Sequence, residues 1–144
     1  MKTKKNGIKI LLFVLTIVIL SNCKKNEDRV FLLQNKWEVK SIFTDKKTLN
    51  APSKNFREEA YILKFVNDSI LQMATSVNCA GGGYVIASEG YININYGIFT
   101  EVCCENDFDK QMINMMNRVN SYYYKGNKLT FSTSENEKII FKKQ

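Results

Sequence analysis

The chain has 144 residues with 21 basic and 14 acidic side chains, a formal charge of +7 and no histidine. The lack of histidine excludes Ser-His-Asp and Cys-His catalysis, and also zinc or iron sites with imidazole ligands. Without the four lysines of its first nine residues the chain keeps 17 basic and 14 acidic groups, so its charge does not predict a nucleic-acid partner.

The N-terminal segment resembles a bacterial lipoprotein signal peptide. Its lysines precede an apolar run of 11 residues, Ile10 to Leu20. This length suits a secretory signal and is about half of what a helix needs to span a bilayer. The sequence Leu20-Ser21-Asn22-Cys23 resembles a lipobox, in which a signal peptidase cuts before a cysteine that carries diacylglycerol. An ordinary secretory signal with an incidental cysteine is the alternative.

We therefore predict a signal peptide over residues 1–22 and a lipidated, palmitate-bearing Cys23. Residues 23–29 are polar and lack apolar periodicity, which is typical of a flexible tether. Residues 30–144 then suffice for one domain with its own core. Lys24 after the cysteine, by resemblance to lipoprotein sorting rules, favours the outer membrane. The expected location is the bacterial cell envelope, with the membrane as a partner through the N-terminal lipid.

Alternating polarity predicts strands in the first half of the domain. The first spans Trp37 to Phe43, with Trp37, Val39, Ser41 and Phe43 on one face, and a loop over residues 46–56 follows. Residues 61–66 and 69–75 predict a hairpin across Asn67-Asp68. The run Gly81 to Gly83 lacks the Gly-Lys-Ser/Thr of a phosphate loop, so we expect a flexible turn that ends this unit.

The second half predicts another hairpin, then a helix, then a meander. Residues 84–88 and 91–96 flank Glu89-Gly90, with Asn93 and Asn95 facing water. Apolar residues then recur at helical spacing, which predicts a helix over residues 107–118. Asn106 is the expected N-cap and Arg118 the basic residue at the C-terminal end. The closing strands are expected at residues 121–125, 128–132 and 138–142.

The fold class predicted from these elements is mainly β: an antiparallel sheet or partly open barrel with one amphipathic helix before the last three strands. This order resembles the META domain, the HslJ-like family of small bacterial envelope proteins. The resemblance is carried by Leu33 and Trp37, Asn78-Cys79 before the glycines, Thr100 to Cys104, and the strand Leu129-Thr130-Phe131. It implies a non-enzymatic structural or interaction role in envelope stress tolerance, with an envelope protein as the expected partner.

The cysteines after the leader are expected to meet an oxidising compartment and so are disulfide candidates. Adjacent Cys103 and Cys104 would point to opposite faces of a strand, so only one can reach Cys79 from a strand. The family resemblance implies that Cys79 pairs with Cys104. Three cysteines without histidine do not complete a metal site, and no paired carboxylates suit acid-base chemistry, so we predict no catalytic residue, metal or cofactor.

A lipocalin-like carrier is the alternative function. It would bind a small hydrophobic ligand in a cavity of hundreds of Å³ lined by residues such as Phe65, Ile94 and Phe131. Lipocalins place their long helix after the barrel, whereas this chain is expected to place three strands after its helix. The position of the helix therefore favours the META-like interpretation.

Overall fold

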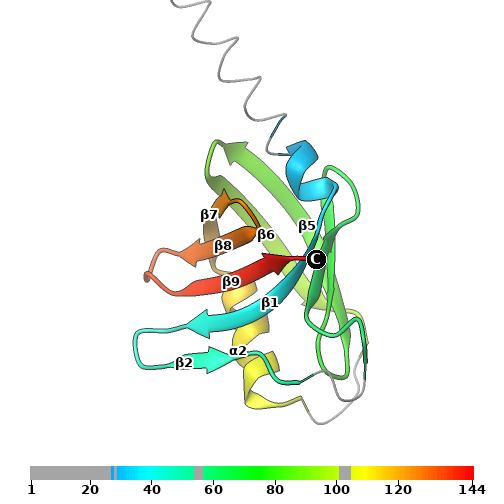
Figure 1. Ribbon diagram of the computed structural model, residues 1–144, viewed down its shortest axis with the longest axis vertical. Helices are drawn as coiled ribbons and strands as arrows, with labels where there is room; N and C mark the ends of the chain where they lie inside the picture. Colours follow the sequence, from blue (N-terminus) through cyan, green and yellow to red (C-terminus); the bar gives the residue numbers. More distant parts are fainter. Residues whose placement is uncertain (1–26, 28, 54–56, 101–104) are drawn as a thin grey trace, which may run out of the picture.

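The strands form one antiparallel barrel, seen in the computed structural model of residues 27, 29–53, 57–100 and 105–144 (Figure 1). The sheet order is β2-β1-β3-β4-β5-β6-β7-β8-β9, and β1 also pairs with β9. Eight strands therefore close on themselves, and β2 is an extra strand on β1. The predicted fold class is confirmed, including the helix α2 before the last three strands. The bounds are β1 (Lys36–Phe43), β2 (Thr48–Asn50), β3 (Ile62–Phe65), β4 (Ile70–Ala74), β5 (Cys79–Ser88), β6 (Tyr91–Ile98), α2 (Asp107–Met116), β7 (Val119–Lys125), β8 (Lys128–Thr133) and β9 (Lys138–Lys143).

The first strand differs from the predicted alternation in its second half. Trp37 and Val39 are buried as expected, but Ile42 is fully buried and Phe43 is 41% exposed. The cause is a register shift between Val39 and Ser41 in the pairing of β1 with β9. A bulge adds one residue to the strand, so the side chains after it change faces.

The predicted loop over residues 46–56 contains the short strand β2. It pairs with the C-terminal half of β1, while β3 pairs with the N-terminal half. Three residues are too few to show a period in the sequence, and β2 exists because β1 offers an unpaired edge there. The hairpin of β3 and β4 is confirmed.

The prediction of a turn at Gly81 to Gly83 is wrong, because these glycines lie inside β5 and pair with both β4 and β6. A Cβ on Gly82 would lie 1.8 Å from the backbone oxygen of Asn95, and one on Gly81 would lie 2.5 Å from that of Leu71. The run therefore permits close approach of neighbouring strand backbones, which is a known use of glycine in strands.

The remaining strand predictions are confirmed with small shifts at their ends. The hairpin of β5 and β6 turns at Gly90, whose φ of 77° suits glycine. Asn93 and Asn95 are exposed, as expected. The strands β7, β8 and β9 form the closing meander. Tyr123 is 65% exposed, whereas its neighbour Tyr122 is buried.

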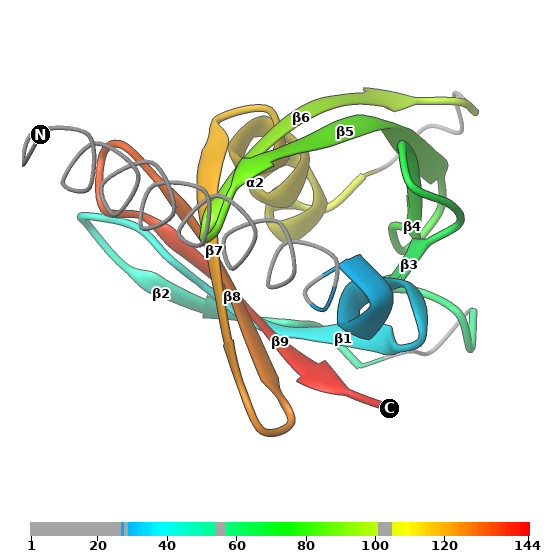
Figure 2. The same ribbon diagram turned by 90° about the horizontal axis from the view of Figure 1, so that it is seen from above.

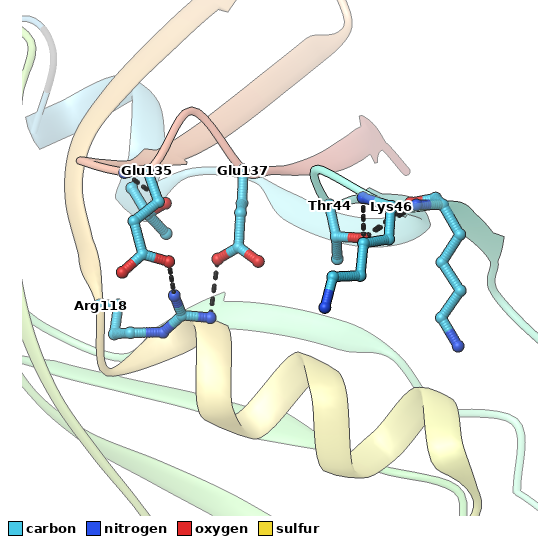
Figure 3. Close-up of polar contacts among 7 residues, drawn as sticks. Thr44, Lys46, Arg118, Glu135 and Glu137 are labelled. Atoms are coloured by element: carbon cyan, nitrogen blue, oxygen red, sulfur yellow. Dashed lines mark hydrogen bonds and ion pairs between the residues drawn. The ribbon is translucent and has the colours of Figure 1, made fainter.

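The helix α2 begins as predicted and ends earlier. Its N-cap is Asn106, whose Oδ1 accepts a hydrogen bond of 2.9 Å from the amide of Asp109. It ends at Met116, so Arg118 lies beyond it and not in its last turn. Arg118 instead forms ion pairs with Glu135 at 2.6 Å and Glu137 at 2.7 Å, both from the β8-β9 turn (Figure 3). A tertiary contact has replaced the expected interaction with the helix dipole.

Helical segments lie toward opposite ends of the barrel (Figures 1 and 2). Residues 29–33 are helical, so Leu33, one of the residues that carry the family resemblance, lies in this helix before β1. Leu32 is fully buried, and Arg29 pairs with Asp68 of the β3-β4 turn at 2.5 Å. At the other end α2 buries Met112 and two further methionines in the core. No helix within the described ranges has the length and apolarity needed to cross a membrane.

Candidate functional site

Asn78 and Thr100, two residues of the predicted family motif, join three elements at the α2 end of the barrel. Asn78 is 2% exposed, and its Nδ2 donates to Glu105 Oε1 at 2.9 Å. Thr100 Oγ1 donates to Asn78 Oδ1 at 3.1 Å and accepts from the amide of Cys79 at 2.9 Å. These bonds hold the start of β5, the end of β6 and the segment before α2 together. The motif residues therefore position the helix.

A second set of contacts surrounds the buried carboxylate of Asp109 at the start of α2. Ser76 Oγ donates to this carboxylate from the β4-β5 loop. Asn106 Nδ2 donates to Ser76 Oγ at 3.3 Å and to the hydroxyl of Tyr61 at 3.2 Å. Burial raises the pKa of Tyr61, with the nearby Asp109 carboxylate adding to the rise and the Asn106 hydrogen bond opposing it. Hydrogen bonds and the N-terminus of α2 therefore stabilise this carboxylate, and among the described residues no cation pairs with it.

Tyr61 carries an unusual backbone at this network. Its φ of 63° lies in the left-handed region, which a bulky residue adopts rarely. Its amide donates to Ala74 O, and its carbonyl accepts from the amide of Val39 at 2.8 Å. Tyr61, Ser76 and Asp109 were not predicted as a cluster, because they are far apart in the chain and match no motif.

Tyr96 lies near the same network with an unsatisfied hydroxyl. The residue is 4% exposed, and its hydroxyl has no hydrogen-bond partner among the described residues. Burial strongly raises its pKa, and the carboxylates of Glu105 and Asp109 raise it further. The native state therefore holds Tyr96 in its protonated form at alkaline pH.

The substitution Tyr96→Phe should stabilise the protein by about 1 kcal/mol at pH 8, because it removes a buried hydroxyl that has no hydrogen-bond partner among the described residues. The advantage should grow by about 1.4 kcal/mol near pH 11, above the unfolded pKa of about 10. Near pH 11 the unfolded wild-type chain gains free energy by ionising Tyr96. The folded chain does not, because its raised pKa keeps Tyr96 protonated. Urea unfolding at both pH values measures this, with the exposed Tyr123→Phe as control. A Tyr96→Phe variant less stable at pH 8 would reveal a partner of the hydroxyl.

A small cavity of about 190 Å³ lies along β3, β4 and β5. Its lining includes Cys79, whose Sγ accepts from Arg57 Nη2 at 3.0 Å, and Glu59, which pairs with Lys64 at 2.7 Å. The hydrogen bond and charge of Lys64 lower the pKa of Glu59. Within this cavity Glu59 pairs with Lys64, and among the described residues the Cys79 thiol is hydrogen-bonded to Arg57 and to no base.

The cysteines predicted to carry a lipid or to form a disulfide are not all described by the structure. Cys23 and Cys104, like Cys103, lie outside the described residues, so lipidation and the Cys79 to Cys104 disulfide stay predictions. Across the described parts of the chain, no three histidine, cysteine or acidic side chains are grouped to hold a metal ion.

The side chains assigned to a ligand cavity belong to the core. Phe65, Ile94 and Phe131 are 4%, 7% and 0% exposed and lie in one hydrophobic cluster. Phe65 packs edge-on against Tyr84, and Phe131 against Phe141, each with ring centroids 5.0 Å apart. The rings of Phe65 and Phe131 therefore pack against other aromatic side chains of the core.

Comparison with known proteins supports the fold and identifies the family. An NMR structure of a protein from Burkholderia xenovorans is similar with a TM-score of 0.63 and 12% identity, over 81% of this chain and 86% of that one. A crystal structure of a DUF4847 family protein from Bacteroides vulgatus has a TM-score of 0.57 and 15% identity, over 77% and 93%. Curated proteins give no match. The family model of the META domain matches residues 31–144, which include every described strand of the barrel, so the chain belongs to the META domain family.

Proposed function

We propose that this META domain protein is lipid-anchored in the bacterial cell envelope and acts through its surface, without catalysis. One observation carries the anchoring: helical residues 29–33, which pack on the barrel, lie six to ten residues after Cys23 of the lipobox-like sequence. The buried Leu32 and the Arg29 ion pair with Asp68 fix this helix on the barrel. A lipid on Cys23 would therefore attach the membrane to one end of a rigid body. Lys24 favours the outer membrane as the site of attachment.

The packing of the barrel supports a role on the surface. Aromatic side chains fill its interior, and helices lie toward both ends, so the described polar network and core stabilise the fold. Large apolar side chains are exposed on the neighbouring strands β5 and β6, namely Val85 and Tyr91. Exposed aromatic side chains are frequent in protein interfaces. An envelope protein is therefore the proposed partner, and stress tolerance the proposed physiological role.

Labelling of the full chain with palmitate in a bacterial host tests the anchor. Wild-type protein should take up label and fractionate with membranes, because two or more acyl chains give stable attachment. Cys23→Ala should take up no label, while Cys79→Ala, which changes another cysteine, should keep it. Label retained in Cys23→Ala would place the anchor elsewhere and contradict the proposal.

A further inference from the structure

Three lysines lie side by side at one end of the barrel. Lys125 of β7 is opposite Lys128 of β8, and Lys128 is opposite Lys142 of β9. All three are exposed, and no carboxylate of a described residue forms an ion pair with Lys125 or Lys128. Like charges on directly opposed strand positions repel and destabilise the sheet. Lys142 also faces the carboxylate of Glu38 on β1, so the uncompensated repulsion in the isolated domain is that between Lys125 and Lys128, and an anionic partner would relieve it.

The lysine row lies at the end of the barrel where the N-terminal segment enters. The amide of Lys143 donates to Asn127 O at 2.7 Å, and that of Gln144 donates to Lys36 O at 3.0 Å. The β7-β8 turn, the C-terminus and the start of β1 are therefore neighbours. Phe31 of the N-terminal helix lies under Lys143, with Nζ 5.6 Å from the ring centroid. Lys36 and Lys143 add two more positive charges at this end.

The proposed lipid anchor would bring this end of the barrel to the membrane. Six residues from Cys23 to Arg29 can extend at most about 20 Å, so this end would stay within that distance of the headgroups. Asp68, a carboxylate at the same end, is already paired with Arg29. Tyr123, two residues before Lys125 on β7, is 65% exposed. Tyrosine beside lysine is a combination that favours the membrane interface.

We propose that the lysine row of Lys125, Lys128 and Lys142 docks the domain on anionic lipid headgroups. This inference rests on the proposed lipid anchor, which sets the distance, while the lysine row sets the orientation. The phosphates of the headgroups neutralise the mutual repulsion of the lysines. Docking in this way directs the α2 end, with its polar network, away from the membrane.

Vesicle binding by an unacylated chain tests the lysine row separately from the anchor. Residues 23–144 with Cys23→Ser contain every strand and the whole core cluster, from Leu32 to Phe141, and so are expected to fold without the leader. This protein should sediment with vesicles of phosphatidylcholine containing phosphatidylglycerol. It should not sediment with phosphatidylcholine alone, and high salt should release it.

The decisive comparison uses two triple variants with the same change in charge. In the first, glutamine replaces the lysine row: Lys125→Gln, Lys128→Gln and Lys142→Gln. Partition should fall about a hundredfold, since one lysine near an anionic surface contributes about fivefold. The control changes lysines at the opposite end of the barrel: Lys46→Gln, Lys47→Gln and Lys138→Gln. It should bind within a few fold of the parent chain.

Equal loss in both variants, or equal binding to both vesicle types, would overturn the proposal. The palmitate experiment has an independent outcome, because the vesicle experiment uses protein without lipid. Palmitate uptake without vesicle binding would refute the docking surface alone. Vesicle binding by the lysine row without palmitate uptake would refute the anchor alone.

Discussion

Replacing Gly82 by alanine should destabilise the barrel by about 3 kcal/mol or more, near the upper end of the cost of overpacking. The added Cβ would lie 1.8 Å from the oxygen and 2.8 Å from the carbonyl carbon of Asn95, and 3.0 Å from Cα of Tyr96. All three are backbone atoms of β6, so no side-chain rotation can remove the clash. The strands β5 and β6 would have to separate at a point where Gly82 also pairs with Leu71 of β4.

Gly83→Ala is the matched control for this prediction. A Cβ there would meet only Ser69 O, at 3.7 Å, which is an ordinary contact. Its stability should change by less than about 1 kcal/mol, since alanine also lowers the entropy of the unfolded chain. Urea unfolding followed by circular dichroism compares the two. Similar midpoints for both variants would show that β5 and β6 can separate locally and would contradict the tight approach.

The second large effect is expected for Arg118→Met. Arg118 holds two carboxylates, and the side chain of Glu137 is only 8% exposed (Figure 3). Removal of the arginine leaves that carboxylate buried without its cation, which costs about 3 kcal/mol at pH 7. The β8-β9 turn would then have to open so that water reaches this carboxylate. Thermal and urea unfolding measure the loss.

Two further variants separate the buried pair from the exposed one. Glu135 is 66% exposed on its side chain, so Glu135→Gln should cost less than about 1 kcal/mol. Adding Glu137→Gln to Arg118→Met should recover much of the stability, because a neutral amide replaces the uncompensated charge. If Glu135→Gln proved as damaging as Arg118→Met, the exposed pair and not the buried one would stabilise this turn.

Features that depend on neighbouring residues in the chain could be predicted before the structure was known. The hairpin across Glu89-Gly90 follows from strand residues around a glycine that adopts positive φ. The helix α2 follows from its apolar spacing and from Asn106, which caps it. The order of these elements was sufficient for the fold class and for the resemblance to the META domain family. Each of these signals is contained within a few turns or one hairpin of the chain.

Features that depend on partners far away in the chain became visible in the folded barrel alone. Closure by β1 and β9 placed a bulge after Val39, so Ile42 is buried in place of Phe43. Gly82 was expected in a turn but lies inside β5, because the backbones of the neighbouring strands approach it closely. The network of Asp109 with Ser76 joins residues 33 positions apart, and the lysine row comes from three different strands. Such contacts arise from strand register and barrel closure, which local propensity and periodicity do not specify.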